Sequence, residues 1–322
     1  MSADLTEAVA VLRDGGLVAF PTETVYGLGA DATNARAVQR LYAVKGRPTD
    51  HPVIVHLASA AELDTYAIEV SDAARALAHA CWPGPLTLVV KVRAGTIAPE
   101  VTGGRPTVAL RVPAHPVALA LLEAFGRGIA APSANRFGRV SPTTAAHVRA
   151  DLGPDVDIVL DGGPTVIGVE STIVDCSGAT PSILRLGGVD AATVEAILGA
   201  PLALRTHGEV AAPGTLEQHY SPAAHVVLVE RGAVAATATA LLAEGDRVGV
   251  LAIEPPAGLP AGLTVLEPPI DVDDYARMLY ARLREADDRD LDVVLVVAPP
   301  PEGIGAAVTD RLARAAASGR IR

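Results

Sequence analysis

A short run of hydroxyl, carboxylate and glycine residues near the start of the chain is the first segment whose composition suits chemistry. Residues 20–29 read FPTETVYGLG and follow the apolar run GLVA. That run and Phe20 predict a short buried strand, because a brief apolar segment is bounded by glycines and a proline. The polar triplet that begins at Thr22 then follows the carboxyl end of the strand, where open α/β sheets bind ligands. Gly27 and Gly29 would permit positive φ and close approach of a ligand, although an ordinary strand-to-helix loop is the preferred explanation of the glycines taken alone.

Two cations follow the next predicted element. Residues 34–44 have the apolar spacing of a helix, and Asn34 is placed to cap its amino end. Lys45 and Arg47 come directly after this helix, in the sequence KGRP. Of the 26 basic residues, Lys45 and Lys91 alone are lysine, so a compact ammonium at this place favours contact with a phosphate. The alternative is the ordinary placement of cations against the carboxyl end of a helix.

Arg111 and Arg185 are single cations within β patterns, TVALRV and SILRL. Buried arginine is rare without a partner. Each guanidinium is therefore expected either to pair with a protein carboxylate or to face a cleft that holds an anion.

Small polar residues follow another apolar strand pattern, in the sequence IAAPSAN. Ser133 and Asn135 lie after its apolar start, and the small residues around them would let a ligand lie against the backbone. Ser141 and Pro142 are then predicted as the N-cap and first position of a helix. The free N–H groups of a helix amino end attract phosphate. A simple capping role for Ser141 is the alternative.

The remaining pattern predicts the elements that position these residues. From residue 225 onward strands and helices alternate, which is typical of a small doubly wound domain. Residues 203–222 lack periodicity and contain prolines and glycines, so they read as a linker. Strands are expected near 86–92, 107–112, 157–161, 171–175 and 182–186, and helices near 71–81 and 190–200.

Eight motifs, in one consistent order, resemble the YrdC/Sua5 family of threonylcarbamoyl-AMP synthases. They span about the first two thirds of the chain, and so many motifs in register are far more specific than any one of them. The motifs are FPTETVYGLG, KGRP, HPVIVHL, WPGPLT, TVALRVP, AAPSAN, GVEST and the LR pair at 184–185.

The resemblance implies an α/β fold in which a YrdC-like domain with a twisted open mixed sheet is followed by a small Rossmann-like Sua5 domain. Their expected limits are 1–202 and 223–322, joined by the linker at 203–222. The segment containing His219 and Tyr220 resembles the family's connection between the two domains. Glu217 stands where the family has a tyrosine, so this chain lacks that tyrosine's contact.

The resemblance also implies the activity of a nucleotidyltransferase that forms threonylcarbamoyl-AMP and pyrophosphate from L-threonine, bicarbonate and ATP. A downstream transferase would pass the threonylcarbamoyl group to adenosine 37 of tRNA. Mg²⁺ is expected on the ATP phosphates, with no protein ligand assigned, and Glu23 is either a general base or holds its loop. The implied threonine contacts are Thr22, His56, Arg111, Ala131, Ser171 and Thr172; the implied ATP contacts are Lys45, Arg47, Thr107, Ser133, Asn135, Ser141, Arg185, His219 and Tyr220.

Composition limits the other classes of function. The formal net charge is −11, and residues 1–202 contribute −5 (15 basic, 20 acidic) while residues 203–322 contribute −6 (11 basic, 17 acidic). No global basic field for nucleic acid is present, so strong direct nucleic-acid binding is not expected. Two cysteines cannot form a disulfide framework. The amino end predicts a helix and no signal peptide, and no apolar run is long enough to span a membrane, so we expect a cytoplasmic protein.

Two alternatives stay open at this point. The same domain could be a non-catalytic RNA-binding module, against which the acidic balance and the 3% aromatic content argue. It could also be a carbamoyl-adenylating domain of the hydrogenase-maturation type, whose larger members carry cysteine-rich zinc modules.

Overall fold

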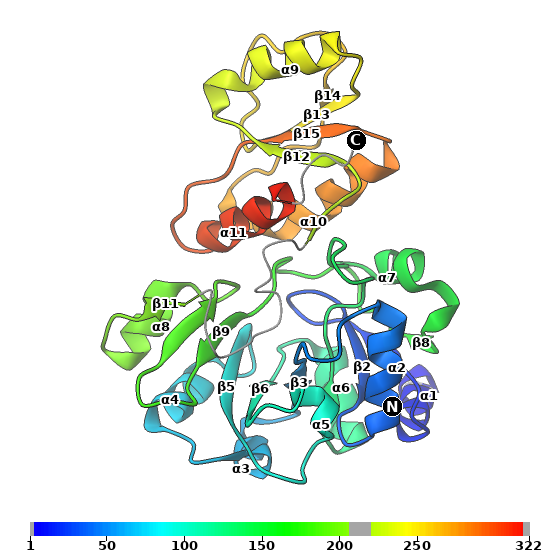
Figure 1. Ribbon diagram of the computed structural model, residues 1–322, viewed down its shortest axis with the longest axis vertical. Helices are drawn as coiled ribbons and strands as arrows, with labels where there is room; N and C mark the ends of the chain where they lie inside the picture. The colour runs from blue at the N-terminus through cyan, green and yellow to red at the C-terminus, as the bar shows by residue number, and fades with distance from the viewer. Residues whose placement is uncertain (1–2, 206–219, 318–322) are drawn as a thin grey trace. The chain divides into compact units, whose positions relative to one another are not determined.

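The computed structural model describes residues 3–205 and 220–317, and it divides into two compact units (Figure 1). Unit 1 consists of Met1–Phe137, Ser141–Val166 and Glu170–Thr215. Unit 2 consists of Gly138–Val140, Ile167–Val169 and Leu216–Arg322. Two three-residue segments from the first part of the sequence thus belong to unit 2.

Unit 1 is built on a mixed sheet, as expected for the YrdC-like fold. In the described part the sheet has eleven strands, in the order β11-β10-β9-β5-β6-β3-β7-β2-β1-β8, with β4 beside β5. The strands are β1 (Val18–Phe20), β2 (Gly27–Asp31), β3 (Ile54–His56), β4 (Ala67–Ile68), β5 (Leu86–Val92), β6 (Thr107–Arg111), β7 (Ile129–Ala130), β8 (Ile158–Val159), β9 (Thr172–Asp175), β10 (Ser182–Arg185) and β11 (Ala203–Leu204). Because β11 pairs with β10, residues 203–204 belong to this sheet and not to the predicted linker.

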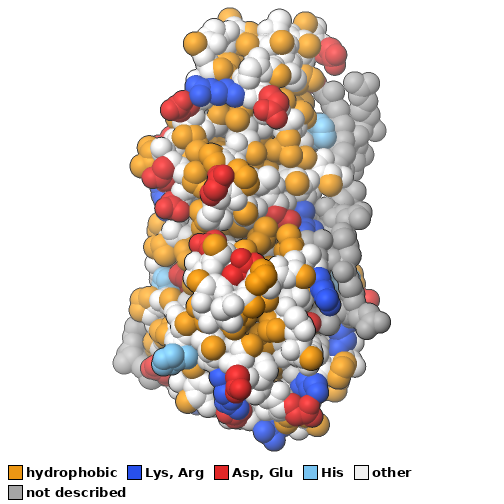
Figure 2. All heavy atoms as spheres, turned by 90° about the vertical axis from the view of Figure 1, so that its left-hand side faces the viewer, with side chains coloured by type: hydrophobic (Ala, Val, Ile, Leu, Met, Phe, Trp, Pro, Cys, Tyr) orange, Lys and Arg blue, Asp and Glu red, His pale blue; other side chains and the backbone are white. Residues whose placement is uncertain are grey.

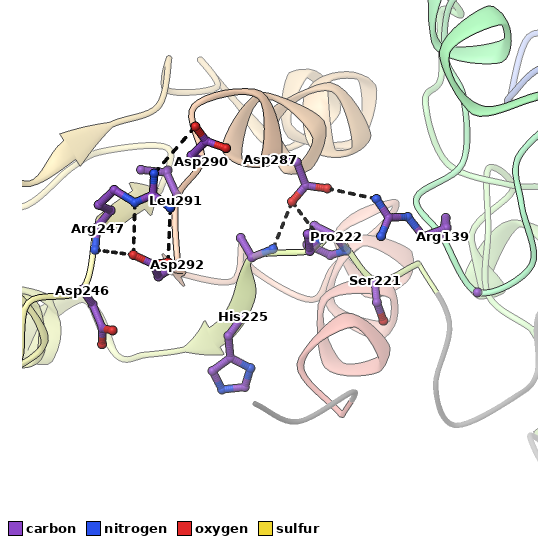
Figure 3. A pocket seen from close by; sticks show the side chains of 13 residues that line it. Arg139, Ser221, Pro222, His225, Asp246, Arg247, Asp287, Asp290, Leu291 and Asp292 are labelled. Carbon is purple, nitrogen blue, oxygen red and sulfur yellow. Dashed lines mark hydrogen bonds and ion pairs between the residues drawn. The ribbon is translucent and has the colours of Figure 1, made fainter. Parts of the chain in front are cut away.

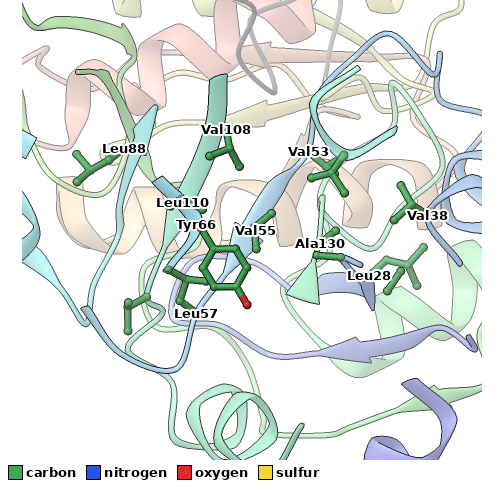
Figure 4. Close-up of a cluster of buried hydrophobic side chains, with 14 of the residues drawn as sticks. Leu28, Val38, Val53, Val55, Leu57, Tyr66, Leu88, Val108, Leu110 and Ala130 are labelled. Atoms are coloured by element: carbon green, nitrogen blue, oxygen red, sulfur yellow. The ribbon is translucent and has the colours of Figure 1, made fainter. Parts of the chain in front are cut away.

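Helices cover this sheet on both faces. A large apolar cluster on one face includes Leu28, Val55 and Leu110 from the strands and Val38 from a helix (Figure 4). A second cluster packs Phe20 and other side chains against the first and sixth helices. The helices are α1 (Ala3–Arg13), α2 (Ala35–Lys45), α3 (Leu63–Tyr66), α4 (Asp72–Cys81), α5 (Pro99–Thr102), α6 (Pro116–Phe125), α7 (Ala145–Leu152) and α8 (Ala191–Leu198), with single 3₁₀ turns at 60–62 and 153–155.

The predicted helix after Asn34 is confirmed. The Asn34 side chain accepts hydrogen bonds from the backbone N–H groups of Arg36 and Ala37, and the helix ends at Gly46 with φ of 64°. The polar cap and the left-handed glycine are local signals, which is why the sequence alone located this helix.

The prediction for Gly27 and Gly29 was wrong. Neither glycine has positive φ, and both lie in β2, which pairs antiparallel with β1. A Cβ on Gly29 would lie 2.8 Å from a methyl of Ile129 and 2.9 Å from the ring of Phe20. Close packing between strands, and not turn geometry, therefore requires glycine at position 29.

The predicted N-cap at Ser141 was also wrong. Helix α7 begins at Ala145, and Thr144 caps it by accepting from the backbone N–H of His147 at 3.2 Å. The Ser141 hydroxyl instead donates to Glu170 Oε1 at 2.7 Å. Serine and threonine are both good caps, so the choice between them was decided by a carboxylate 29 residues away in the sequence.

Unit 2 is a small parallel α/β unit with the order β12-β15-β13-β14, and it confirms the Rossmann-like prediction. Helix α9 covers one face of its sheet, while α10 and α11 cover the other (Figure 1). The elements are β12 (His225–Leu228), α9 (Val234–Ala243), β13 (Val248–Leu251), β14 (Thr264–Val265), α10 (Val272–Asp288), β15 (Val293–Val296) and α11 (Gly305–Ala316), with a 3₁₀ turn at 231–233.

Among the helices described in either unit, none has both the length and the apolar character needed to cross a membrane.

Candidate active site

Arg111 forms a buried ion pair at the carboxyl end of β6. Its Nη2 donates to Glu23 Oε1 at 2.6 Å, and both side chains are at least 94% buried. Its Nη1 donates to Thr24 Oγ1 at 3.0 Å, and its Nε donates to the Gly84 carbonyl at 3.2 Å. Of the two alternatives left by the sequence, pairing with a protein carboxylate is the one observed. Three of the five guanidinium N–H groups make these contacts, which leaves two for a further acceptor.

Glu23 is held from both sides by this arrangement. Its second oxygen, Oε2, accepts from the backbone N–H of Ala114 at 3.0 Å. These two contacts fix the orientation of the carboxylate. Of the two roles considered for Glu23, this geometry favours holding the loop and orienting Arg111.

Thr22 forms the turn that presents Glu23. Its hydroxyl donates to the Val25 carbonyl at 2.7 Å and lies 2.8 Å from the hydroxyl of Thr24. The backbone N–H groups of Thr24 and Val25 point back to the Thr22 oxygen. The polar triplet is therefore a hydroxyl-stabilised turn that links the loop after β1 to Arg111.

His56 lies beside Arg111 on the same face of the sheet. Strands β3 and β6 are parallel, and His56 and Arg111 are partners in their register. Burial and the neighbouring Arg111 charge lower the pKa of His56 to about 3, so the imidazole is neutral. Its Nδ1 is buried and has no hydrogen-bond partner among the described residues. A buried polar atom without a partner next to a guanidinium indicates a place for a ligand.

Lys45 holds the backbone of the loop that contains Ser133 and Asn135. Its Nζ donates hydrogen bonds to the backbone carbonyls of Ser133 and Asn135, each at 2.5 Å. The ammonium is buried, and desolvation, followed by the nearby Arg47 charge, holds its pKa well below the usual range. An ammonium has three donors, so one remains for a phosphate. This loop contact was missed by the sequence analysis, which considered only a phosphate or the helix end.

Arg47 is also directed at backbone carbonyls. Its Nη2 donates to the Pro52 carbonyl at 2.9 Å and its Nε to that of His51 at 3.3 Å. The guanidinium lies 5.9 Å from the centre of the Phe137 ring. Arg47 thus fixes the chain just before β3.

A third polar group joins Ser171, Thr87 and Arg185. The Ser171 hydroxyl lies 2.8 Å from that of Thr87, and Arg185 Nη2 donates to the Ser171 carbonyl at 2.8 Å and to its hydroxyl at 3.1 Å. Thr172 is directed elsewhere, because its hydroxyl donates to the Val189 carbonyl. Thr172 therefore fixes the local backbone, and Thr87 is a neighbour that the sequence analysis did not identify.

Three more predicted site residues, Ala131, Ser133 and Asn135, make hydrogen bonds or bridges to the backbone of other residues. Ala131 donates its backbone N–H to the Ile54 carbonyl at 2.8 Å, and Ser133 bridges to Gly27. Asn135 donates to the Arg136 carbonyl at 2.9 Å.

Thr107 lies at the start of β6, four residues from Arg111 and so about 13 Å away along the strand. The register of β3 and β6 places it near Pro52, to which Arg47 donates. The predicted threonine contacts His56 and Arg111 thus lie toward one end of these strands, and the predicted ATP contacts Thr107 and Arg47 toward the other.

Tyr220 belongs to unit 2 and is 99% buried. Its ring stacks on Tyr280 at 5.6 Å between centres, and Arg311 lies 5.1 Å from its centre. This packing fixes the Tyr220 ring within unit 2, and its contact with ATP stays a prediction. His219, Glu217 and the predicted linker from 206 onward to His219 lie outside the described residues.

Two family models match the chain in succession. One, described as "Telomere recombination" and named for Sua5, YciO and YrdC, matches residues 10–187. The other, described as the C-terminal domain of threonylcarbamoyl-AMP synthase, matches residues 189–317.

Relatives are similar over nearly the whole chain. The threonylcarbamoyl-AMP synthase of Pyrococcus abyssi is 42% identical over 96% of this chain and 92% of its own length. The protein of the same name from Bacillus subtilis is 40% identical over 99% of this chain and 94% of its own length. The crystal structure of Pyrococcus abyssi Sua5 complexed with L-threonine superposes with a TM-score of 0.91 at 40% identity, covering 97% of this chain and 94% of that one.

Proposed function

The chain belongs to the Sua5 family of threonylcarbamoyl-AMP synthases, and from this premise we propose that it joins L-threonine, bicarbonate and ATP into threonylcarbamoyl-AMP, with release of pyrophosphate. The observation that carries the proposal is the pair of His56 and Arg111 on one face at the carboxyl ends of two parallel strands. The guanidinium has two N–H groups left for an acceptor, and the imidazole has a buried nitrogen without a described partner. Such a pair suits an amino acid, which offers a carboxylate and hydrogen-bond donors.

The reaction proceeds in two chemical steps. The threonine amine attacks the carbon of bicarbonate. A C–N bond forms and one water is expelled, which gives an N-carboxylate. An oxygen of that N-carboxylate then attacks the α-phosphorus of ATP in line, and pyrophosphate leaves. Both steps depend mainly on the positioning of anions and on compensation of their charge.

The residues of unit 1 supply this positioning. Arg111 binds the threonine carboxylate in an orientation fixed by Glu23 and Thr24. His56, which is neutral, accepts a hydrogen bond from threonine through Nδ1. Lys45, Arg47 and Arg185 supply positive charge toward the nucleotide, and Lys45 also fixes the loop at Ser133.

Mg²⁺ is proposed to bind through phosphate oxygens of ATP. Two buried carboxylates among these polar groups are already engaged, because Glu23 accepts from Arg111 and Glu170 accepts from Ser141. Mg²⁺ commonly binds through substrate phosphates with few protein ligands, and it would fit a site whose carboxylates are engaged in this way. When bound, it neutralises phosphate charge. Loss of pyrophosphate release in EDTA, with recovery on added Mg²⁺, is the expected result.

The product is proposed to be consumed by a tRNA threonylcarbamoyl transferase that modifies adenosine 37. A mixed anhydride of a carbamate and a phosphate is an activated acyl donor, so an acyl-transfer reaction must follow it. The family comparisons support this function over an RNA-binding module or a carbamoyl-phosphate-dependent enzyme, since both units match the Sua5 models in order.

The decisive experiment is pyrophosphate release by the purified protein. It should require ATP, threonine and bicarbonate together, and Arg111→Ala should raise the threonine KM far more than the ATP KM, because a charge-assisted carboxylate contact is lost. Equal activity with carbamoyl phosphate and no threonine would contradict the proposal.

A further inference from the structure

We propose that Thr87 contacts substrate, and that its hydroxyl donates a hydrogen bond to an oxygen of bicarbonate and then to the same oxygen of the N-carboxylate. The inference rests on the proposed function, which supplies these two anions. It defines a bicarbonate subsite within unit 1, built from Thr87, Ser171 and Arg185. All three residues are buried, and Thr87 has no exposed surface.

Thr87 lies on the face of the large sheet that carries Arg111 and His56. Strand β5 pairs antiparallel with β6, and Leu88 lies opposite Leu110 in that register. The preceding residue, Thr87, therefore lies opposite Arg111, and side chains at directly opposite positions share a face. His56 is the partner of Arg111 on its other side. The three side chains thus form one row across β5, β6 and β3.

The packing of neighbouring residues agrees with this orientation. Leu88, the next residue of β5, belongs to the large apolar cluster on the opposite face. Val89, two positions after Thr87, belongs to a separate small cluster that includes Ala109. Ala109 is two positions before Arg111 in β6. Successive side chains of a strand alternate between faces, so Thr87 and Arg111 both lie on the face of the small cluster.

The hydrogen bonds of the Thr87–Ser171 hydroxyl pair leave one hydrogen over. Arg185 Nη2 donates to Ser171 Oγ at 3.1 Å, and Ser171 Oγ lies 2.8 Å from Thr87 Oγ1. Each hydroxyl has one hydrogen, and a single hydrogen fills the bond between them. The other hydrogen has no acceptor among the described residues. A buried donor without an acceptor is costly, so its presence indicates a place for a ligand.

The guanidinium determines which hydroxyl keeps the spare hydrogen. A hydroxyl that accepts from a cation becomes a better donor, because hydrogen bonds in a chain polarise one another. Ser171 accepts from Arg185, so it donates to Thr87, and the hydrogen of Thr87 is left for the ligand. This chain begins at a cation and ends at a donor, which favours an anionic acceptor.

Bicarbonate is the anion that suits this position. Arg111 is proposed to bind the threonine carboxylate, and one carbon separates that carboxylate from the amine that bicarbonate must reach. Opposite residues of an antiparallel pair have Cβ atoms about 5 Å apart. A group attached to the amine therefore lies within reach of Thr87, while the threonine carboxylate stays with Arg111.

The contact serves both chemical steps. When the amine attacks, a C–N bond forms and one C–O bond of bicarbonate breaks, and the departing hydroxyl leaves as water with a proton from the amine. A hydrogen bond from Thr87 to a remaining oxygen draws electron density from the carbon and so assists the attack. The same hydrogen bond then orients the N-carboxylate, whose other oxygen attacks the α-phosphorus.

The charged groups around a cavity of unit 2 are different, because their bonds are made within that unit (Figure 3). This cavity has a volume of about 580 Å³. Asp287 there accepts from the backbone N–H groups of Ala223 and Ala224 at 2.8 and 3.0 Å. Asp292 accepts from the backbone N–H of Arg247 at 2.8 Å. These carboxylates are satisfied by the protein, whereas the hydroxyl pair still has a hydrogen to donate.

Kinetics of pyrophosphate release test the inference, with bicarbonate varied in buffers freed of dissolved CO₂. Thr87→Val keeps the shape of the side chain and removes the hydroxyl. We expect it to raise the bicarbonate KM by at least about tenfold, because a hydrogen bond to a charged group is lost. The threonine KM and the ATP KM should be nearly unchanged. Thr87→Ser retains the hydroxyl, so its bicarbonate KM should stay close to wild type.

Thr102→Val is the matched control. Thr102 is also buried in unit 1, but its hydroxyl donates to the Pro99 carbonyl at 3.1 Å within α5. All three KM values of this variant should match the wild type, and thermal unfolding measures the stability of both valine variants. If Thr87→Val does not fold, Thr87→Ala removes the same hydroxyl and gives the same comparison.

The three KM values of the variant without the Thr87 hydroxyl decide the outcome. An unchanged bicarbonate KM would show that this hydroxyl binds nothing in the reaction. A rise confined to the threonine KM would assign the hydroxyl to threonine, and a rise confined to the ATP KM would assign it to a phosphate. Each of these results overturns the inference.

Failure of the proposed function gives a different result, in which the wild-type protein releases no pyrophosphate from ATP with threonine and bicarbonate. Carbon-13 line broadening of labelled bicarbonate then measures binding without turnover. Broadening by the wild type that is lost in Thr87→Val supports the subsite. Equal broadening by both proteins, or none by the wild type, overturns the inference.

Discussion

Glu23 and Arg111 form a buried ion pair, and Arg111 is the residue proposed to bind the threonine carboxylate. Glu23→Gln keeps a similar shape but leaves the Arg111 charge without its partner in a buried site. We expect a loss of about 3 kcal/mol in the free energy of unfolding, together with a higher threonine KM, because Arg111 loses its fixed orientation. Urea denaturation and pyrophosphate-release kinetics measure the two effects.

Glu69→Gln is the matched control for this prediction. Glu69 pairs with Lys91, but the two side chains are 66% and 43% exposed. Exposed pairs contribute at most about 1 kcal/mol, so stability and threonine KM should stay close to wild type. An unchanged threonine KM in Glu23→Gln would show that Arg111 orients itself without help.

His56 makes a pH dependence of stability testable. Its pKa is about 3 in the folded protein, against about 6.5 in the unfolded chain. The unfolded chain therefore binds the extra proton between these values, and the free energy of unfolding falls as pH drops from 6.5 toward 3, by at most about 1.4 kcal/mol per pH unit. Above pH 6.5 this contribution is constant.

His56→Gln isolates the effect of that single group. The substitution removes the titration but keeps a polar side chain, so the loss of stability between pH 6.5 and 5 should be smaller than in the wild type. Urea denaturation at the two pH values gives the comparison. Equal losses in both proteins would mean that His56 accepts a proton in the folded state at its ordinary pKa.

At the scale of elements, β2 depends on the absence of a side chain at Gly29. Gly29→Ala places a methyl 2.8–2.9 Å from Ile129 and Phe20, where all three residues are packed against one another. We expect a loss of about 1–3 kcal/mol, since overpacking forces neighbours out of place. Thermal unfolding measures this.

Gly178→Ala is the control for that substitution. Gly178 lies between β9 and β10, and a Cβ there would have open space. Its melting temperature should change little. If Gly29→Ala unfolded at the same temperature as Gly178→Ala, the strand pairing of β1, β2 and β7 would have to be looser than the structure shows.

At the scale of the whole molecule, charge determines which partners can bind tightly. The net charge is −11, and on the face shown in Figure 2 basic side chains are interspersed with acidic ones, with no continuous basic patch among the coloured atoms. Tight non-specific binding of nucleic acid depends on many released counterions. We expect tRNA to bind weakly and to leave the rate of pyrophosphate release unchanged.

Fluorescence anisotropy with labelled tRNA at about 50 and 200 mM salt tests this. Submicromolar affinity that falls by orders of magnitude over this range would revive the RNA-binding alternative. The two units carry similar formal charge by sequence, so neither is the better candidate for such binding.

Much of the architecture could be read from the sequence because its signals are local. Alternating apolar residues identified β5 and β6, helical spacing and Asn34 identified α2, and the alternation after residue 225 identified unit 2. Each of these patterns depends on side chains that are close in sequence, within one or two helical turns or within a few positions of one strand. The family motifs then identified the chemistry, since their order is itself a property of the sequence.

Only the tertiary structure decided which partner each polar residue has. Glu23 and Arg111 are separated by 88 positions, Lys45 and Ser133 by 88, and Ser141 and Glu170 by 29. No local rule distinguishes a serine that caps a helix from one that bonds a distant carboxylate, or a lysine that binds phosphate from one that also holds a loop. The sequence determined the groups available for threonine, bicarbonate and ATP; folding determined their partners, because hydrogen bonds and buried charges depend on distances in space, which the order of residues does not specify.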